Sequence, residues 1–282
     1  MQIMDSEIPE IVSSSPRWPE TKTLALCVTF NFESGEAAPI NPGNNPNYLY
    51  MTTHQYGARR GVWNLLDMLD RKKIPATFFV CGTTAEKYPE TIREISDRGH
   101  DIAAFTYSCE KVWSLSSKQE AEMIDRSIAA IENAIGKKPT GWRCPDFKIS
   151  DNTLRLLCER GFAWDSDLLN SEVPYILEIA GRKIVEIPAS MWTYDKYVYY
   201  LPSPRGSARE LFEIWQDELK VLYQESLEQP KLITLSSHPF LLGRPAPLAE
   251  LENFLGRALE RSGIWPATCS QVANWWSDLC AE

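Results

Sequence analysis

The chain has 282 residues, 44% of them hydrophobic, and a formal net charge of −9. This length and composition exclude a disordered chain and suffice for two modest domains or for one α/β barrel. An acidic chain without a stripe of lysine and arginine lacks the charge that a phosphate backbone attracts, so we expect no nucleic-acid partner.

The chain begins with a polar segment, and we expect residues 1–22 to form an arm on a single domain that spans residues 1–282. Acids stand where a secretory signal would be basic, and nowhere do about 18 apolar residues follow one another, as a transmembrane helix requires. The seven cysteines form no C-x-x-C pair, which is typical of free buried thiols. We therefore expect a cytoplasmic protein that does not enter membranes.

Behind this arm, strand-like and helix-like segments alternate. Continuous apolar and β-branched runs indicate buried strands, and apolar residues on one helical stripe indicate helices. The pairs Ser117/Glu120 and Ser207/Glu210 predict capping boxes for two of the helices. In chain order, we expect strand 24–32, helix 57–72, strand 76–81, helix 89–98, strand 101–105, helix 118–135, strand 140–143, helix 151–160, strands 162–165 and 183–187, helix 207–226, strand 231–236, helix 247–261, strand 264–267 and helix 268–280.

This alternation predicts the fold class α/β, with a regular or distorted (β/α) barrel of seven or eight strands. Residues 34–55 do not fit the alternation, because they hold three prolines and four asparagines and show no periodicity. A loop of this length predicts a lid or a contact between subunits, with His54 at its far end. We expect a homo-oligomer on these grounds.

The C-terminal ends of the strands are where a (β/α) barrel carries its functional residues. The segment D-I-A-A-F-T-Y-S-C-E at 101–110 should form the floor of a pocket, with Tyr107 between two further candidates. The residues expected to converge on one mouth are Asn31, Glu33, Phe105, Cys109, Arg143, Asp165 and His238.

Motifs spread over nearly the whole chain carry a family resemblance. They include N-F-E-S-G after the first strand, K-K-I-P-A-T-F-F-V, R-G-H-D-I-A-A, P-T-G-W-R-C-P, G-F-A-W-D-S-D-L-L and S-S-H-P-F-L-L-G-R-P. In this order they resemble the polysaccharide deacetylase (NodB-homology) superfamily, and most of all its allantoinase and cyclic-imidase branch. The resemblance implies a distorted barrel and hydrolysis of C–N bonds.

The resemblance also implies roles for single residues. Glu33 stands at the family's acidic metal ligand, Asn31 at its base, and His238 at its late histidine, while the two metal histidines fall on Phe105 and Cys109. Phenylalanine ligates nothing, and one carboxylate with one thiol is too few for a catalytic zinc, which takes about three protein ligands. We expect no bound zinc and no other cofactor.

For each candidate residue, a functional role and a structural role are both open. Glu33 is a general base whose pKa apolar neighbours raise, or a carboxylate held by backbone N–H groups. His238 is a general acid or base, or a buried structural histidine. Cys109 is a nucleophile if a base reaches it, or a small apolar side chain. Arg143 clamps a substrate, orients Asp165 or makes a structural salt bridge.

Further pocket walls are expected from residues that carry large or charged side chains near these ends. Arg59, His54 and Trp192 fit this description, and Trp192 belongs to the aromatic run M-W-T-Y-D-K-Y-V-Y-Y, which also includes Tyr194 and Tyr197. Packing or a subunit contact explains such a run equally well.

Three hypotheses for function follow. The first is a metal-independent enzyme on a small carbonyl or amide compound, most simply a hydrolase of non-peptide C–N bonds, in which Glu33 and His238 move protons and Asn31 or Arg143 polarises an oxygen. A lyase or isomerase needs only the same positioned groups. The others are a non-catalytic descendant that binds a small molecule or a partner, and a metalloenzyme with a rebuilt ligand set.

Overall fold

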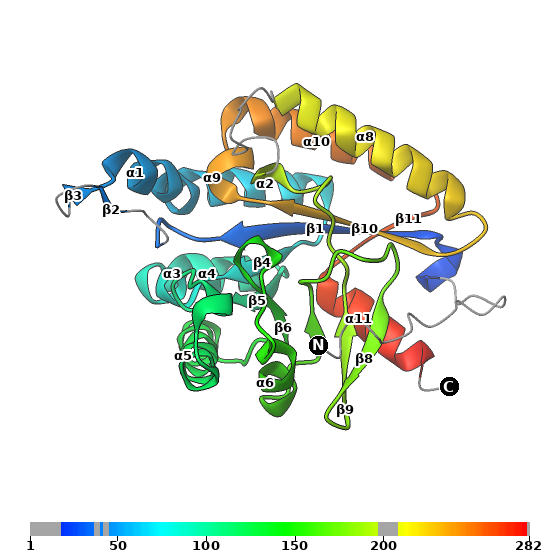
Figure 1. The fold of residues 1–282 in the computed structure, drawn as a ribbon. Coiled ribbons are helices and arrows are strands. Elements are labelled where there is room, and N and C mark those ends of the chain that lie inside the picture. Colours follow the sequence, from blue (N-terminus) through cyan, green and yellow to red (C-terminus); the bar gives the residue numbers. More distant parts are fainter. Residues whose placement is uncertain (1–17, 37–39, 42–44, 197–207, 281–282) are drawn as a thin grey trace.

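The computed structural model describes residues 18–36, 40–41, 45–196 and 208–280. Its centre is a nine-stranded, mostly parallel sheet that curls into an open, distorted barrel (Figure 1). This confirms the predicted α/β fold class. Along the main path, the strands lie in the order β10 (Lys231–Ser237), β1 (Leu24–Phe32), β4 (Thr77–Val80), β5 (Asp101–Phe105), β6 (Gly141–Arg143), β7 (Trp164–Asp165), β9 (Arg182–Glu186) and β8 (Tyr175–Ile179).

Strand β1 organises the sheet because it pairs with three neighbours. It lies along β10 over most of its length, its first half also pairs with β11 (Ile264–Ala267), and its second half pairs with β4. Strand β8, which the sequence pattern missed, runs antiparallel to β9 and ends the sheet. A hydrogen bond from Leu232 N to Glu172 O (2.7 Å) links the segment before β8 to β10.

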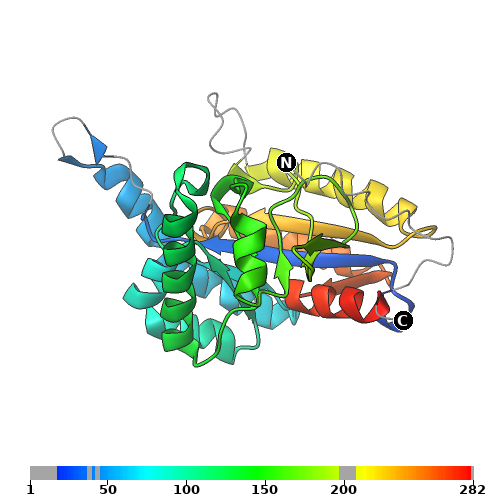
Figure 2. The same ribbon diagram turned by 60° about the horizontal axis from the view of Figure 1, so that its bottom comes forward.

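Helices pack around this sheet (Figures 1 and 2). Helices α8 and α10 lie together over β10, whereas α3, α4 and α5 lie beside β4 and β5. None of the helices in the described ranges is long and apolar enough to cross a membrane. The helices are α1 (Tyr48–Tyr56), α2 (Val62–Lys72), α3 (Gly82–Lys87), α4 (Pro89–Asp97), α5 (Ser117–Ile135), α6 (Thr153–Glu159), α8 (Ala208–Glu225), α9 (Pro239–Leu242), α10 (Pro245–Leu259) and α11 (Cys269–Leu279).

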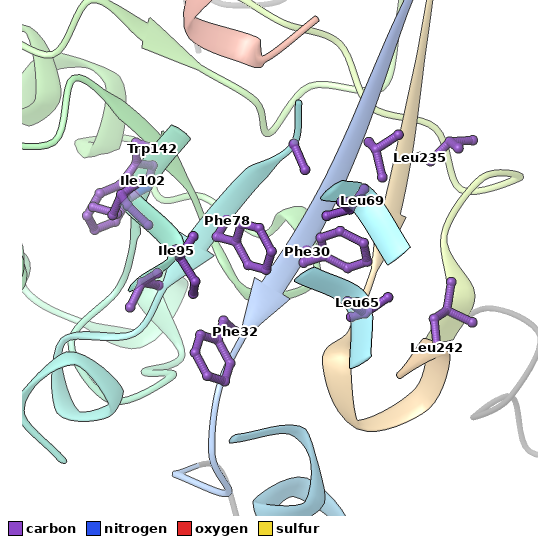
Figure 3. Packing of buried hydrophobic residues seen from close by; sticks show 14 of the residues in the cluster. Phe30, Phe32, Leu65, Leu69, Phe78, Ile95, Ile102, Trp142, Leu235 and Leu242 are labelled. Atoms are coloured by element: carbon purple, nitrogen blue, oxygen red, sulfur yellow. The ribbon is translucent and has the colours of Figure 1, made fainter. Parts of the chain in front are cut away.

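The two faces of β1 carry different side chains near its C-terminal end. Every residue of the strand is buried, and successive side chains point to opposite faces. One face carries Phe30 and Phe32, which pack against β4 and α2; the rings of Phe30 and Phe78 are 5.0 Å apart (Figure 3). The opposite face carries Thr29 and Asn31, so the barrel interior receives polar groups directly before Glu33.

The predicted loop 34–55 contains secondary structure within its described parts. It contains the two-residue strands β2 (Ile40–Asn41) and β3 (Asn45–Pro46) and then α1, which together extend away from the body in both ribbon views. The absence of a helical pattern was misleading here, because α1 is capped by Asn47 and buries little except His54.

A π-helical turn, Gly57–Gly61, joins α1 to α2 and packs directly on α9. A methyl group at Gly61 would lie 2.1 Å from Pro239 O, and one at Gly57 would lie 2.9 Å from Phe240 N. Only glycine permits this approach, which brings α1, with His54, beside the segment that follows His238.

Two capping predictions have different outcomes. Helix α5 is capped by Ser116 with Gln119, not by Ser117 with Glu120, because the Glu120 carboxylate is buried and accepts hydrogen bonds from Ser150 and Thr153. The predicted Ser207/Glu210 box involves a residue outside the described ranges, as does the prediction for Tyr197.

Candidate active site

Glu33 lies at the C-terminal end of β1 and is 2% exposed. Its Oε1 is 3.3 Å from Lys196 Nζ and 3.6 Å from His54 Nε2, and its Oε2 accepts a hydrogen bond from Cys109 Sγ at 3.0 Å. Burial raises the pKa of this carboxyl, but Lys196, His238, Cys109 and His54 together lower it to about 2. The predicted rise in pKa was wrong, because the sequence did not show the cation beside Glu33.

His54 is fixed so that one nitrogen faces Glu33. Its Nδ1 bonds to the carbonyl oxygen of Tyr50 (2.9 Å), and its ring lies between those of Tyr50 and Phe240, with centroids 3.9 and 3.8 Å away. A carbonyl only accepts, so Nδ1 carries the proton. Burial lowers the pKa of His54 despite the nearby carboxylate of Glu33, so Nε2 is a hydrogen-bond acceptor that faces a second acceptor.

His238 follows β10 and is fully buried. Its Nδ1 lies 2.7 Å from Asp195 Oδ1, and its backbone N donates to Asp195 Oδ2 at 2.6 Å. Burial lowers the pKa of the imidazole, as does Lys196, while burial raises the pKa of the Asp195 carboxyl. His238 and Asp195 therefore share one proton at Nδ1 while the imidazole stays neutral. The other ring nitrogen, Nε2, is left to contact a substrate.

Sequence reasoning missed Asp195 and Lys196. They follow a parallel β-bridge between Tyr194 and Ser236, which is supported by a hydrogen bond from Ser236 N to Thr193 O (2.9 Å). The bridge places two consecutive residues beside His238 and Glu33. The only signal in the sequence was the pair of opposite charges inside the aromatic run, and it specifies no partner.

Arg143 and Asn31 meet in the interior, but Arg143 does not orient Asp165. The guanidinium donates to Asn31 Oδ1 (3.3 Å) and Thr29 Oγ1 (2.9 Å), and also to the backbone and side-chain oxygens of Ser166 (3.1 and 2.8 Å). The guanidinium carbon lies over the Phe79 ring, 3.8 Å from its centroid. With these bonds made, Arg143 positions the Asn31 amide.

Asp165 belongs to a separate buried group of carboxyls with Asp167 and Glu186. Burial raises the pKa of Asp165 and of Glu186 well above their usual ranges, and it raises that of Asp167 to about 6. Asp167 accepts from Cys144 N (2.7 Å) and Glu186 from Leu168 N (2.9 Å). The predicted role of Asp165 as a substrate contact gains no support from this placement.

Cys109 is a protonated thiol. Its Sγ lies 2.9 Å from Cys81 Sγ and donates to Glu33, while both cysteines remain free. Burial raises the pKa of Cys109 well above its usual value, and Cys81 and Glu33 raise it further. Such a thiol is a hydrogen-bond donor at neutral pH, and this argues against its role as a nucleophile.

The donors around Glu33 do not fit the metal that the resemblance implies. Phe105 is 1% exposed and packs in the core, and Lys196 places an ammonium beside the one carboxylate that a cation would need. Glu36, Cys81 and Cys109 have donor atoms within 4.8 Å of one another. However, the two sulfurs are closer than the roughly 3.8 Å that two zinc–sulfur bonds of about 2.3 Å impose. Glu36 already accepts from Ser34 and Thr84.

The remaining predicted contacts lie apart from Glu33. Tyr107 donates to Glu86 Oε2 (2.9 Å) and packs under the Arg126 guanidinium. Arg59 is exposed on the π-helical turn. Trp192 is 56% exposed and lines a cavity of about 340 Å³ between the β7–β8 connection, β10 and α8, whose described lining includes neither Glu33 nor His238.

Comparison with known proteins places these observations in context. The sequence profile of the polysaccharide deacetylase family matches residues 43–163. A Mycobacterium smegmatis protein assigned as a polysaccharide deacetylase is 32% identical, with a TM-score of 0.86 and 94% of each chain covered. The structure of Puue allantoinase is 27% identical, with a TM-score of 0.87 over 97% of each chain. The peptidoglycan deacetylase of Helicobacter pylori is 27% identical over 76% of this chain and 83% of its own.

Proposed function

The chain belongs to the polysaccharide deacetylase family, a family of hydrolases, and from that premise we propose that it hydrolyses a non-peptide C–N bond of a small carbonyl or amide compound without a metal ion. Puue allantoinase, whose name denotes action on a small compound, matches over nearly the whole chain, which favours a small substrate over a polysaccharide. The burial of Glu33 and His238 favours the same choice.

One observation carries the proposal. Glu33 Oε1, His54 Nε2 and His238 Nε2 are buried polar atoms without a hydrogen-bond partner among the described residues. Buried polar atoms are nearly always hydrogen-bonded, so a carboxylate oxygen and the nitrogens of two imidazoles that interact with it indicate a site for a polar ligand. Two of them, Glu33 Oε1 and His54 Nε2, are acceptors 3.6 Å apart. A substrate N–H or the attacking water satisfies both, and amides, imides and ureides carry such N–H groups.

The protonation states divide the work between the two predicted catalytic groups. Glu33, with a pKa of about 2, is a weak proton acceptor at neutral pH and orients the water or the substrate as a fixed carboxylate. His238 exchanges the proton through Nε2, while Asp195 holds Nδ1 and thereby fixes the ring. Asn31, whose Oδ1 accepts from Arg143, offers its amide N–H groups to an oxygen.

Metal-independence rests on the donor set. The residues at the two histidine positions of the family are Phe105 and Cys109, and the first of these offers no ligand atom. We therefore derive no step through a metal. The test is turnover by protein stripped with a chelator, and stoichiometric loss of activity on chelation would end this part of the proposal.

The decisive experiment is a turnover screen of small amides, imides and ureides. His238→Asn should lower kcat about 100- to 10,000-fold, and Glu33→Gln should lower it comparably, with folding checked by circular dichroism. The matched control is His100→Asn, because His100 accepts a hydrogen bond from Ala76 N and lies outside the site. Unchanged turnover in His238→Asn would refute the assignment.

Oxygen-18 water separates the alternatives. Hydrolysis places one labelled oxygen in the product, whereas a lyase or isomerase that uses the same proton-transfer groups leaves the product unlabelled. A protein that binds compounds from the screen, turns none over and is indifferent to substitution of Glu33 is a non-catalytic descendant.

We further propose that the protein is a cytoplasmic homo-oligomer whose subunits meet through α1. Tyr48 and Leu49 are 69% and 80% exposed on this projecting helix, and a paired exposure of large apolar side chains is typical of a protein contact. Leu49→Glu should reduce the mass measured by light scattering to that of one chain, and an unchanged mass would refute the assignment of this surface. Val221→Glu, at an exposed apolar residue of α8, is the control.

A further inference from the structure

Lys196 is the charged residue nearest to Glu33, and its backbone is held in place. The β-bridge of Tyr194 to Ser236 anchors the segment, and the side chain of Asp195 is bound to His238. The Lys196 side chain is 20% exposed, which is more than Glu33 and less than a free surface lysine. The side chain therefore reaches from the partly exposed surface to the buried carboxylate.

Within the described ranges, this ammonium forms ion pairs with two carboxylates. Its Nζ lies 3.3 Å from Glu33 Oε1 and 3.8 Å from Asp146 Oδ1, and Asp146 is in turn held by the Tyr194 hydroxyl at 3.0 Å. An ammonium has three N–H donors. The two contacts are ion pairs, and Glu33 Oε1 has no hydrogen-bond partner among the described residues, so the N–H donors of the ammonium are available to a further oxygen at the edge of the site.

No other described cation at this site is as available to a substrate. Arg143 is fully buried and donates its N–H groups to Thr29, Asn31 and Ser166. His54 and His238 are neutral, because burial lowers the pKa of each. The positive charge that balances Glu33 is thus the Lys196 ammonium.

We propose that Lys196 supplies the fixed positive charge of this site: its ammonium polarises the carbonyl oxygen of the substrate and keeps divalent cations away from Glu33. A preorganised ammonium in a water-poor site stabilises an oxyanion without reorganisation, as a metal would. The same charge repels a metal ion from the nearest carboxylate. The first half of this inference rests on the proposed function, whereas the second half does not.

Cadmium titration tests the second half without any substrate. Cadmium binds thiolates, and Cys81, Cys109 and Glu33 offer a ligand set once the ammonium is gone, provided that the two sulfurs, now 2.9 Å apart, separate on binding. The thiolate-to-cadmium absorption band reports binding, and elemental analysis gives the stoichiometry. We expect Lys196→Met to bind cadmium at least about tenfold more tightly than the wild type, and Lys196→Arg, which keeps the charge, to behave as the wild type does.

Equal cadmium affinities in the wild type and Lys196→Met, including no measurable binding by either, overturn the exclusion of cations. Tight binding by Lys196→Arg does so too, because it shows that shape rather than charge matters. A thermal unfolding curve for each variant shows that the comparison is made on folded protein.

Turnover tests the first half once a substrate is known. Lys196→Met should lower kcat about 100- to 1,000-fold with KM changed less than about threefold, which is typical of a group that acts on the developing oxyanion. A change confined to KM overturns the role in polarisation. If Lys196→Met binds cadmium more tightly but keeps its kcat, only the role of Lys196 in polarisation is refuted. If His238→Asn keeps its activity, the proposed function is refuted instead.

Discussion

The cluster of three buried carboxyls, Asp165, Asp167 and Glu186, allows a quantitative prediction about the free energy of unfolding. Burial raises the pKa of Asp167 to about 6, against its usual 3.8, while the Cys144 N–H and Arg143 oppose the rise. Because the pKa is raised on folding, the folded state binds the proton more tightly than the unfolded state does. The stabilisation is complete below about pH 4 and is lost as the pH rises through about 6.

The magnitude follows from the size of the shift. About two pKa units, at about 1.4 kcal/mol each, correspond to roughly 3 kcal/mol of unfolding free energy lost between acidic and neutral pH. Asp167→Asn cannot ionise, and its side-chain oxygen still accepts from Cys144 N. Relative to the wild type, the variant should therefore gain about 3 kcal/mol as the pH rises from about 4 to about 7.

Urea unfolding of both proteins at the two pH values measures this difference, and subtraction removes the titration of the groups that do not interact with Asp167. Asp97→Asn, at an exposed position of α4, is the control and should show no such change. A difference between Asp167→Asn and the wild type that does not vary with pH would refute the reasoning, since Asp167 would then ionise alike in the folded and unfolded states.

Three further substitutions test the site and its support. Cys109→Ser keeps a donor to Glu33 and should retain turnover within about threefold, whereas a nucleophilic role predicts a loss of at least about 1,000-fold, and kcat measurement decides. Asp195→Asn should lower kcat at least about 100-fold with little change in KM, because the imidazole loses the group that shares its Nδ1 proton; an equal loss of thermal stability would point to a structural role instead. Gly61→Ala places a methyl group against α9 and should lower the Tm by about 5 °C in calorimetry. Gly256→Ala in α10 should not lower it, because the added methyl group would meet only Lys72 Nζ, at an ordinary contact distance of 3.7 Å.

The strands were predictable because their signal is local. The run from Leu24 to Phe32 is apolar on both faces, since helices cover one side and the barrel interior the other, and the structure gives the same bounds. Strand β8 and helix α1 were not predicted. Each is short and only partly buried, so the sequence of each shows little periodicity.

The site was predictable only in part, for a physical reason. Residues at strand ends, such as Glu33 and His238, are positioned by the sheet, and the sheet can be inferred from the sequence. Lys196 and Asp195 are positioned by a tertiary contact with β10, which no local pattern encodes. Asp165 was placed correctly at a strand end. The sequence could not show, however, that its carboxyl lies beside those of Asp167 and Glu186 and that burial raises its pKa.

Phe105, at a position where the family resemblance implies a metal ligand, and Lys196 bear on the charge of the same site. Burial by itself raises the pKa of Glu33 and favours the protonated carboxyl, and Lys196 makes the largest of the contributions that oppose it. The ammonium 3.3 Å away reverses that outcome. Since Asp195 holds His238 and the next residue forms an ion pair with Glu33, a single anchored segment contacts both groups and helps to keep a carboxylate and a neutral imidazole at the same mouth.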